Sequence, residues 1–210
     1  CTTDSNHSFP ISPNLLKRNF HASGPNRVWV SDITQVRAGS RWLYLCAIQD
    51  LYSRRIVGWS MKSHMETSLV TDALEMATLQ RGIHQGLIFH SDRGSQYASH
   101  EFRQTLRGYG FVSSMSRKGD CWDNACAESF FASMKKEMNC RAFESVKDAR
   151  NRIFNYIELF YNRRRKHSYL GNISPDQFEM QRVAGKVSEK IGVVQRGLVG
   201  EILSMDQFNH

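Results

Sequence analysis

The chain has 210 residues, of which 40% are hydrophobic and 11% aromatic, and its formal net charge is +8. This composition supplies a core for one large domain and excludes wholesale disorder. No apolar run reaches the length of a membrane span, and the N-terminus does not look like a signal peptide, so we expect no membrane partner. Because the first residue is Cys1 rather than Met, we expect an excised piece or a processed product.

The positive charge is concentrated in one part of the chain. Residues 131–170 hold ten Lys and Arg against four Asp and Glu, which accounts for +6 of the net charge. Such a concentration is typical of a surface that binds a polyanion, and a solvated helical face is the alternative. The five cysteines form no C-x-x-C pair, which predicts reduced thiols in a cytosolic protein.

The first part of the chain predicts a lead-in followed by an antiparallel meander. Pro and Gly discourage regular structure in residues 1–26, an extended N-terminal lead-in. Three stretches rich in aromatic and β-branched residues follow, with short breaks that suit antiparallel turns. These predicted strands cover residues 27–36, 41–50 and 54–62. Apolar residues at helical spacing then predict a helix at 67–79, capped by Thr67 or the serine after it and ended by Gly82.

Strands and helices alternate in the next part of the chain. We expect strands at 86–91 and 111–115, with a helix at 98–108 between them. The order of these elements implies an α/β fold, with a mixed five-stranded sheet flanked by helices. A polar loop then leads to the helix that carries Glu128, and a long helix follows at about 145–164.

The predicted elements divide the chain into three parts. The lead-in is followed by a core domain at residues 27–165. A C-terminal extension covers residues 166–210, with a short helix near 174–182 and a tail to which the sequence assigns no structure.

Three carboxylates lie where separate elements could bring them together. Asp32 interrupts the first strand, Asp92 ends the fourth strand, and Glu128 opens a helix after 35 intervening residues. If the two strands are parallel neighbours, Asp32 and Asp92 lie side by side, at the edge where α/β sheets bind ligands. Three acidic side chains at one point repel each other unless cations hold them, and Mg²⁺ accepts such oxygen ligands. In a basic chain this favours chemistry on phosphodiesters assisted by two ions, Mg²⁺ or Mn²⁺.

A lysine on the same helix supports this interpretation. Lys135 follows Glu128 by seven residues, nearly two helical turns, so both side chains face the same side. Glu128 could then bind metal while Lys135 contacts a phosphate, and a surface ion-pair stripe is the alternative. A zinc site is disfavoured because the eight histidines show no zinc-binding spacing with paired cysteines.

The residues around these carboxylates resemble the three blocks of DDE insertion-sequence transposases. The blocks are Trp-Val-Ser-Asp-Ile-Thr at 29–34, His-Ser-Asp-Arg-Gly-Ser-Gln-Tyr at 90–97 and Trp-Asp-Asn-Ala-Cys-Ala-Glu-Ser at 122–129. Segments at 50–59 and 161–178 match as well, so the similarity covers roughly residues 9–180. The resemblance implies a ribonuclease-H-like fold related to retroviral integrases. It also implies that Asp32, Asp92 and Glu128 form the metal-binding triad, and that Lys135 contacts the transposon end.

The resemblance further implies a two-step reaction on DNA. Metal-dependent hydrolysis at the transposon end exposes a 3′-hydroxyl, which then attacks a second phosphodiester in strand transfer. The implied partners are transposon-end DNA, target DNA and further copies of the chain in a synaptic complex, in the bacterial cytoplasm at the nucleoid. The helical DNA-binding region that usually lies upstream in the family is not in this sequence, so we expect the chain alone not to recognise its ends specifically. A ribonuclease-H-like nuclease without strand transfer and a DNA-binding module with an inactive triad are the alternatives.

Polar and basic side chains outside the triad are further candidates for DNA contact. They are Arg93, Ser95, Gln96 and Tyr97 after the fourth strand, Arg117 and Lys118 in the polar loop, and Arg163, Arg164, Arg165 and Lys166 at the end of the long helix. Gly94 permits a close backbone approach, and Tyr97 could stack on a base or pack in the core. Solvent exposure, and cations that stabilise a helix end, are the alternatives for the basic residues.

Other residues near the candidate site have structural interpretations. We expect Asp50 to cap a turn rather than to bind metal, and Asp123 or Asn124 to cap the helix of Glu128. His90 either contacts the substrate or packs at its strand end. Four aromatic residues are expected in the core: Trp29, Trp42, Trp59 and Phe111.

Overall fold

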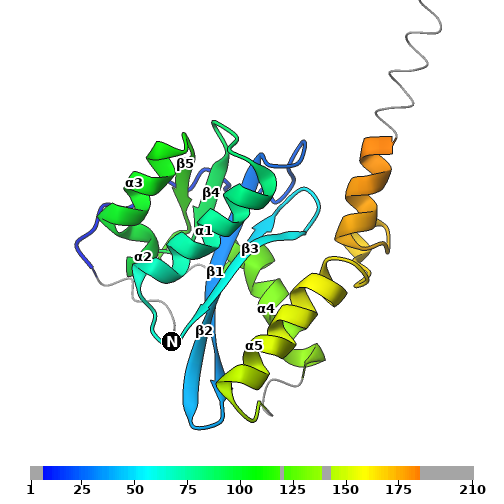
Figure 1. Cartoon of the computed structure of the whole chain (residues 1–210). Coiled ribbons are helices and arrows are strands. Elements are labelled where there is room, and N and C mark those ends of the chain that lie inside the picture. The colour runs from blue at the N-terminus through cyan, green and yellow to red at the C-terminus, as the bar shows by residue number, and fades with distance from the viewer. Residues whose placement is uncertain (1–6, 119–120, 139–142, 185–210) are drawn as a thin grey trace, which may run out of the picture.

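The computed structural model describes residues 7–118, 121–138 and 143–184. A central sheet is covered by helices on both faces (Figure 1). Its strands are β1 (Val28–Ala38), β2 (Arg41–Asp50), β3 (Ile56–Lys62), β4 (Ile88–Ser91) and β5 (Val112–Met115). The helices are α1 (Thr67–Arg81), α2 (Ser95–Ala98), α3 (His100–Gly108), α4 (Ala125–Glu137) and α5 (Val146–Asn155), and residues 175–184 are also helical.

The strand order in the sheet is β3-β2-β1-β4-β5. β1 pairs with β2 and β2 with β3 in antiparallel fashion, as the short breaks between them predicted. β1 pairs with β4 and β4 with β5 in parallel fashion. The predicted mixed five-stranded sheet is therefore confirmed, and β1 lies at its centre.

The central strand β1 contributes side chains to both faces of the sheet. Trp29 and Ile33 belong to the core cluster under α1, α2 and α3. Val36 and Ala38 belong to the cluster under α4 and α5. Because successive side chains of a strand point to opposite faces, the even-numbered residues of β1, Asp32 included, face α4.

Helix α1 lies very close to the sheet. A Cβ atom on Gly58 of β3 would lie 2.3 Å from the backbone oxygen of Ala73, so a glycine is required there. The helix ends at Gly82, as predicted, and the Gly82 N–H donates to the Thr78 carbonyl. The predicted cap is wrong, because Glu66 with its extended backbone holds that position and makes no side-chain cap bond.

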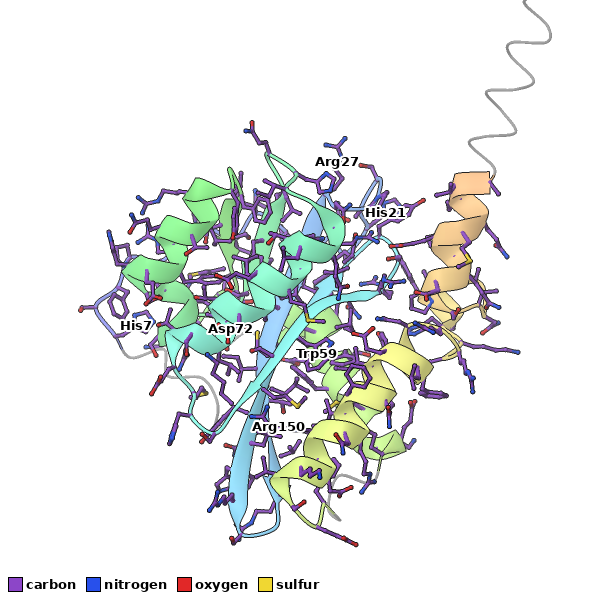
Figure 2. The ribbon with its side chains drawn as sticks, viewed as in Figure 1. His7, His21, Arg27, Trp59, Asp72 and Arg150 are labelled. Carbon is purple, nitrogen blue, oxygen red and sulfur yellow. The ribbon has the colours of Figure 1, made fainter. Side chains whose placement is uncertain are left out.

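Trp42 and Trp59, both expected in the core, differ in their surroundings. Figure 2 shows Trp59 between β3 and α5, where its Nε1 donates to Glu158 Oε1 at 2.8 Å. Trp42 was expected in the core, but 43% of it is exposed. The reason is its place near the tip of the β1–β2 hairpin, where it pairs with Arg37 and the Arg37 guanidinium lies over its ring.

The helix predicted at about 145–164 changes its winding part-way along. The α-helical segment α5 ends at Asn155, and a π-helix continues over Tyr156–Tyr161. Each π-turn contains more residues than an α-turn, so the side chains beyond Tyr161 face directions that an uninterrupted α-helix would not give them.

The N-terminal lead-in and the C-terminal helix at 175–184 are both held by specific contacts to the rest of the domain. In the lead-in, Leu16 and Ala22 are buried, and the Leu15 N–H donates to Ser114 Oγ at 2.9 Å. In the helix at 175–184, Glu179 forms an ion pair with Arg81 of α1 at 2.8 Å. No helix in the described ranges is long and apolar enough to cross a membrane.

Candidate active site

Asp32 and Asp92 lie level with each other on neighbouring parallel strands. The ladder between β1 and β4 pairs Val28 with Ile88 and Val30 with His90. The same offset, continued by two residues, brings Asp32 level with Asp92, which directly follows β4. Neighbouring strands are about 4.8 Å apart. Val30 and His90 lie on the face of the sheet that α4 covers, and each aspartate follows one of them by two residues. Because side chains alternate along a strand, the two carboxylates share that face.

The start of α4 is fixed against β1 next to Asp32. The Asn124 side chain donates from Nδ2 to the backbone oxygen of Ser31 at 3.1 Å. Ala127, in the first turn of α4, packs with Val30 of β1. Because Glu128 follows Ala127 directly, the third carboxylate enters the site from the helix layer. Asn124 was expected to cap α4; it does hold the N-cap position, but its side chain makes no cap bond and joins the helix to the sheet instead.

Asp123 is also an anchor rather than a helix cap. Its side chain is fully buried and accepts hydrogen bonds from Arg117, Arg18 and Asn14. The Arg117 guanidinium holds the pKa of Asp123 well below its usual range. One carboxylate therefore ties the start of α4 to the loop after β5 and to the lead-in.

His90 belongs to the same anchor. Burial lowers the pKa of His90 to about 4, so its imidazole is neutral at pH 7. Its Nε2 donates to the backbone oxygen of Asp123 at 3.0 Å, and its Nδ1 accepts from Ser114 Oγ at 2.8 Å. Of the two interpretations of His90, the packed strand-end histidine is the one observed.

The pKa shifts of the carboxylates show that the charged groups lie close together. Burial, followed by the charges of Asp92 and Glu128, raises the pKa of Asp32 to about 8, and Lys135 acts in the opposite direction. Burial and Asp92 also raise the pKa of Glu128. The three carboxylates and Lys135 thus lie within one another's electrostatic range, with the signs that repulsion among the acids requires.

The loop after β4 approaches Asp92 closely. The Gly94 N–H donates to Asp92 Oδ1 at 2.9 Å. A Cβ atom on Gly94 would lie 3.0 Å from the same oxygen, so the glycine permits this approach, as predicted. The backbone therefore orients the Asp92 carboxylate at the end of its strand.

Within the described ranges, no three His, Cys, Asp or Glu side chains are arranged to hold a metal ion together. Asp32 and Asp92 are partly buried, whereas Glu128 is exposed at the helix surface. The available donors are nevertheless carboxylate oxygens that repel one another, and this is donor chemistry that suits a hard divalent cation.

Comparison with known proteins places the chain in a family. An integrase core domain model matches residues 22–121, and a second integrase core domain model matches residues 109–175. The chain belongs to the integrase core domain family. It is 48% identical over 179 residues to the transposase InsF for insertion sequence IS3fB of Escherichia coli (strain K12), covering 85% of this chain and 62% of that protein.

A second relative comes from Shigella sonnei. The insertion element IS600 uncharacterized 31 kDa protein is 47% identical over 178 residues, covering 84% of this chain and 65% of that protein. The chain thus spans slightly less than two thirds of the length of these curated relatives.

Solved structures confirm the predicted ribonuclease-H-like fold of retroviral integrase cores. The HTLV-2 integrase catalytic core domain in complex with magnesium superposes with a TM-score of 0.58 at 17% identity, covering 75% of this chain and 98% of that one. The simian T-cell lymphotropic virus intasome gives a TM-score of 0.63 at 15% identity, covering 84% of this chain and 60% of that one. At these identities the similarity concerns the fold alone.

Two of the residues predicted to contact DNA are buried instead. Tyr97 is 1% exposed, and its hydroxyl lies 2.8 Å from that of Ser31, so it is a core residue and cannot stack on a base. Gln96 is 7% exposed, and its amide donates to the Met65 backbone oxygen. Both predictions were wrong because the short helix α2 turns these side chains into the core beneath it.

Two of the predicted arginines bind carboxylates of the protein itself. Arg117 binds Asp123 through two nitrogens. Arg165 forms an ion pair with Glu137 at 2.8 Å.

The other predicted contacts are at least partly accessible. Lys118, Lys135, Arg163, Arg164 and Lys166 are exposed, and Arg93 and Ser95 are partly exposed.

Sequence reasoning missed Arg54, which follows the β2–β3 turn. Its guanidinium contacts the lead-in, helix α4 and the ring of Tyr169, which are far apart in the sequence. The only local signal was an arginine pair within the segment 50–59 that resembles the transposase family.

Proposed function

We propose that this chain is the catalytic core of a transposase that cuts DNA at transposon ends and joins the freed 3′-hydroxyl to target DNA. The observation that carries the proposal is the level placement of Asp32 and Asp92 on adjacent parallel strands, facing the helix that presents Glu128. Membership of the integrase core domain family and the 48% identity to the InsF transposase support it, and the chain covers 62% of that relative.

In this proposal Asp32, Asp92 and Glu128 hold two divalent cations, Mg²⁺ or Mn²⁺. Such ions, when bound, activate the attacking oxygen and stabilise the leaving oxygen of an in-line displacement at phosphorus. The magnesium complex of the HTLV-2 integrase core, which has the same fold, supports this choice. The pKa of Asp32 near 8 means that the metal-free chain keeps a proton on this carboxyl at neutral pH.

Lys135 would position the DNA in this proposal. It extends from the same face of α4 as Glu128, and its charge is felt at Asp32. An ammonium group there can contact the phosphate next to the bond that is cut, without taking part in the displacement itself. Arg93 and Ser95 near Asp92, Lys118 after β5, and Arg163 and Arg164 beyond the π-helix would extend the DNA contact.

Transposon-end and target DNA are the proposed substrates, bound by several copies of the chain in a synaptic complex. The solved intasome and the trimeric and dimeric forms of the HTLV-2 core support self-association as a property of this fold. The proposed place of action is the bacterial nucleoid.

The test uses a branched DNA, because strand transfer run backwards needs no recognition of a transposon end. A labelled Y-shaped duplex carries a 3′-hydroxyl beside the branch. Its attack on the branch phosphodiester joins the two target segments and releases the transposon-end arm with a free 3′-hydroxyl. We expect Mg²⁺- or Mn²⁺-dependent release by the native chain. Asp32→Asn, Asp92→Asn and Glu128→Gln should each reduce it at least about 1,000-fold, because removal of a ligand disables the metal site.

Glu101→Gln is the matched control, since this carboxylate lies in the first turn of α3, in the opposite helix layer. The proposal fails if the three triad variants retain native release. Cutting of the branched DNA without joining would indicate a nuclease, and salt-sensitive binding without metal-dependent activity would indicate a DNA-binding module.

A further inference from the structure

A polar pocket of about 530 Å³ lies beside α4, away from the carboxylates. Its walls include Ser129 and Ser133 of α4, Tyr161 at the end of the π-helix, and the segment 165–169. In a helix that advances about 100° per residue, Ser129 and Ser133 lie roughly 100–140° around the axis from Glu128. The pocket is therefore a separate site on another face of the same helix.

The pocket contains an almost fully buried cation. Arg54 is 9% exposed, and it donates to Cys126 Sγ at 2.8 Å and to the Phe20 backbone oxygen at 3.2 Å. Within the described ranges, no carboxylate lies at ion-pair distance from its guanidinium. Buried arginines are ordinarily paired with an anion, because neutral partners compensate only part of the lost hydration. The Arg54 backbone also has a positive φ of 60°, which a non-glycine residue rarely adopts.

Two further polar atoms at the pocket lack a partner. His167 Nε2 and Gln49 Oε1 are buried and make no hydrogen bond within the protein. Gln49 is only 3% exposed, and its amide nitrogen is held by the Tyr161 hydroxyl and the Arg54 backbone oxygen. Buried polar groups without partners are uncommon in folded proteins, so these atoms point to a polar ligand.

The electrostatics of the pocket favour an anion. Burial, with the charges of Arg165 and Arg54, lowers the pKa of His167 to about 4, so the imidazole is neutral at pH 7. Part of the Arg165 charge is offset by its ion pair with Glu137. Lys166, an exposed residue that also lines the pocket, adds a further positive charge.

An aromatic ring lies at this buried cation. The Tyr169 ring stacks on the Arg54 guanidinium, 4.2 Å from its centre, and more than half of Tyr169 is exposed. Aromatic rings and arginine planes together form the surfaces on which unpaired bases stack. The pocket volume falls within the range of sites for single small molecules, whereas a duplex is far wider.

We propose that this pocket binds one nucleotide of unpaired DNA, with Arg54 and Lys166 at its phosphate and Tyr169 against its base. His167 Nε2 and Gln49 Oε1 supply a donor and an acceptor for the polar edge of the nucleotide. The proposal depends on the proposed function only for the identity of the ligand as DNA. It adds a contact that lies on a different side of α4 from the cleavage site.

The experiment measures binding rather than cleavage, so that its outcome is independent of the catalytic proposal. A fluorescein-labelled ten-nucleotide oligothymidylate is titrated with the Asp32→Asn chain at several salt concentrations. Lys166→Ala should weaken binding about fivefold and lower the slope of log K against log salt by about 0.7, the value for one lost phosphate contact on a single strand. Tyr169→Ala should weaken binding about tenfold, and Tyr169→Phe should restore it.

Lys147→Ala, at the exposed start of α5 away from the pocket, is the charge-matched control and should bind as the parent does. Thymidine 5′-monophosphate should displace the labelled strand at lower concentration than inorganic phosphate does. The proposal is overturned if Lys166→Ala and Tyr169→Ala bind like Lys147→Ala, or if inorganic phosphate competes equally well. If these variants do weaken binding but the branched DNA is never joined, the pocket stands and the catalytic proposal falls.

Discussion

Asp32 and Asp92 are adjacent because β1 and β4 run parallel with a constant offset of 60 residues. The two carboxylates therefore repel each other within a partly buried site, and this repulsion adds to burial in raising the pKa of Asp32 to about 8. The geometry that suits a shared cation therefore destabilises the folded chain when no cation is bound.

The proton on Asp32 should stabilise the metal-free chain, and this contribution should be lost as the pH rises through about 8. The folded chain holds a proton on Asp32 with a pKa near 8, whereas the unfolded chain releases it near 3.8. Between these values this carboxyl binds more protons in the folded state, so its contribution to the free energy of unfolding falls with rising pH. Below pH 6.5 the buried, neutral His90 and His167 act in the opposite direction, because the unfolded chain protonates them. Urea titrations in the presence of a chelator, at pH 7, 8 and 9, should therefore show the decline.

Asp32→Asn should make that decline shallower and should raise the urea midpoint at pH 9. Asp72→Asn, at an exposed carboxylate that pairs with Lys62 on the surface, should leave the pH dependence unchanged. A native-like slope in Asp32→Asn would show that the repulsion among the carboxylates does not govern stability.

Lys135→Ala should reduce strand joining on the branched DNA about tenfold, mainly through a higher KM, because the lysine is expected to bind the phosphate and not the reacting oxygen. Lys136→Ala provides the control on the same helix. Lys136 is also exposed, but it points about 80° away from Glu128 around the helix axis. Equal effects of the two substitutions would mean that only the overall charge of α4 matters.

Asp123→Asn should destabilise the chain by about 1–2 kcal/mol, because it removes the charged acceptor of two arginines. The loss is kept in this range by the exposure of Arg18 and Arg117, whose side chains are about half accessible. Since the folded-state pKa of Asp123 is depressed, its stabilisation is present above the unfolded pKa and is lost as the pH falls toward acid.

The measurement is thermal unfolding at pH 7 and at pH 3, where Asp123→Asn and the native chain should differ less. Asp148→Asn, in an exposed pair with Arg152 within α5, should cost no more than about 0.5 kcal/mol at either pH. A similar loss for both aspartates would argue against a special role for Asp123.

Gly58→Ala should destabilise the chain by about 3 kcal/mol. The new methyl group would lie 2.3 Å from the Ala73 backbone oxygen and 2.7 Å from the Ala77 Cβ, so α1 would have to move off β3. Gly108→Ala, in α3 with no atom within 4 Å of the added Cβ, should instead stabilise by about 0.5–1 kcal/mol. Chemical denaturation of both variants checks the contrast.

The sheet was predictable because its signals are local. Runs of aromatic and β-branched residues, broken at short turns, indicated β1, β2 and β3, and the parallel pairing of β1 with β4 was the arrangement that the two aspartates required. The positions of side chains outside the strands were harder to predict from the sequence, because they depend on contacts between distant segments. Tyr97 illustrates this: a tyrosine in a polar loop suggested base stacking, but α2 directs it onto Ser31.

The same limit explains the other differences. Asn124 and Asp123 have the side chains that helix caps need. In the folded chain, however, Asn124 bonds to the Ser31 backbone and Asp123 bonds to Arg117. Arg54 gave no signal, because Cys126 and Tyr169, which surround it, lie 72 and 115 positions further along the chain. Sequence patterns thus predicted the three carboxylates and the elements that carry them, whereas the anchors of α4 emerged only in three dimensions.

The tether between Asn14 and Asp123 has a consequence for the order of folding. It joins residues 109 positions apart, and the neighbouring bond from Arg18 joins residues 105 apart. Contacts of such long range form only after the intervening chain has been brought together, at a large entropic cost. We therefore expect the sheet to be in place before α4 settles, so that the element carrying Glu128 is among the last to reach its native position.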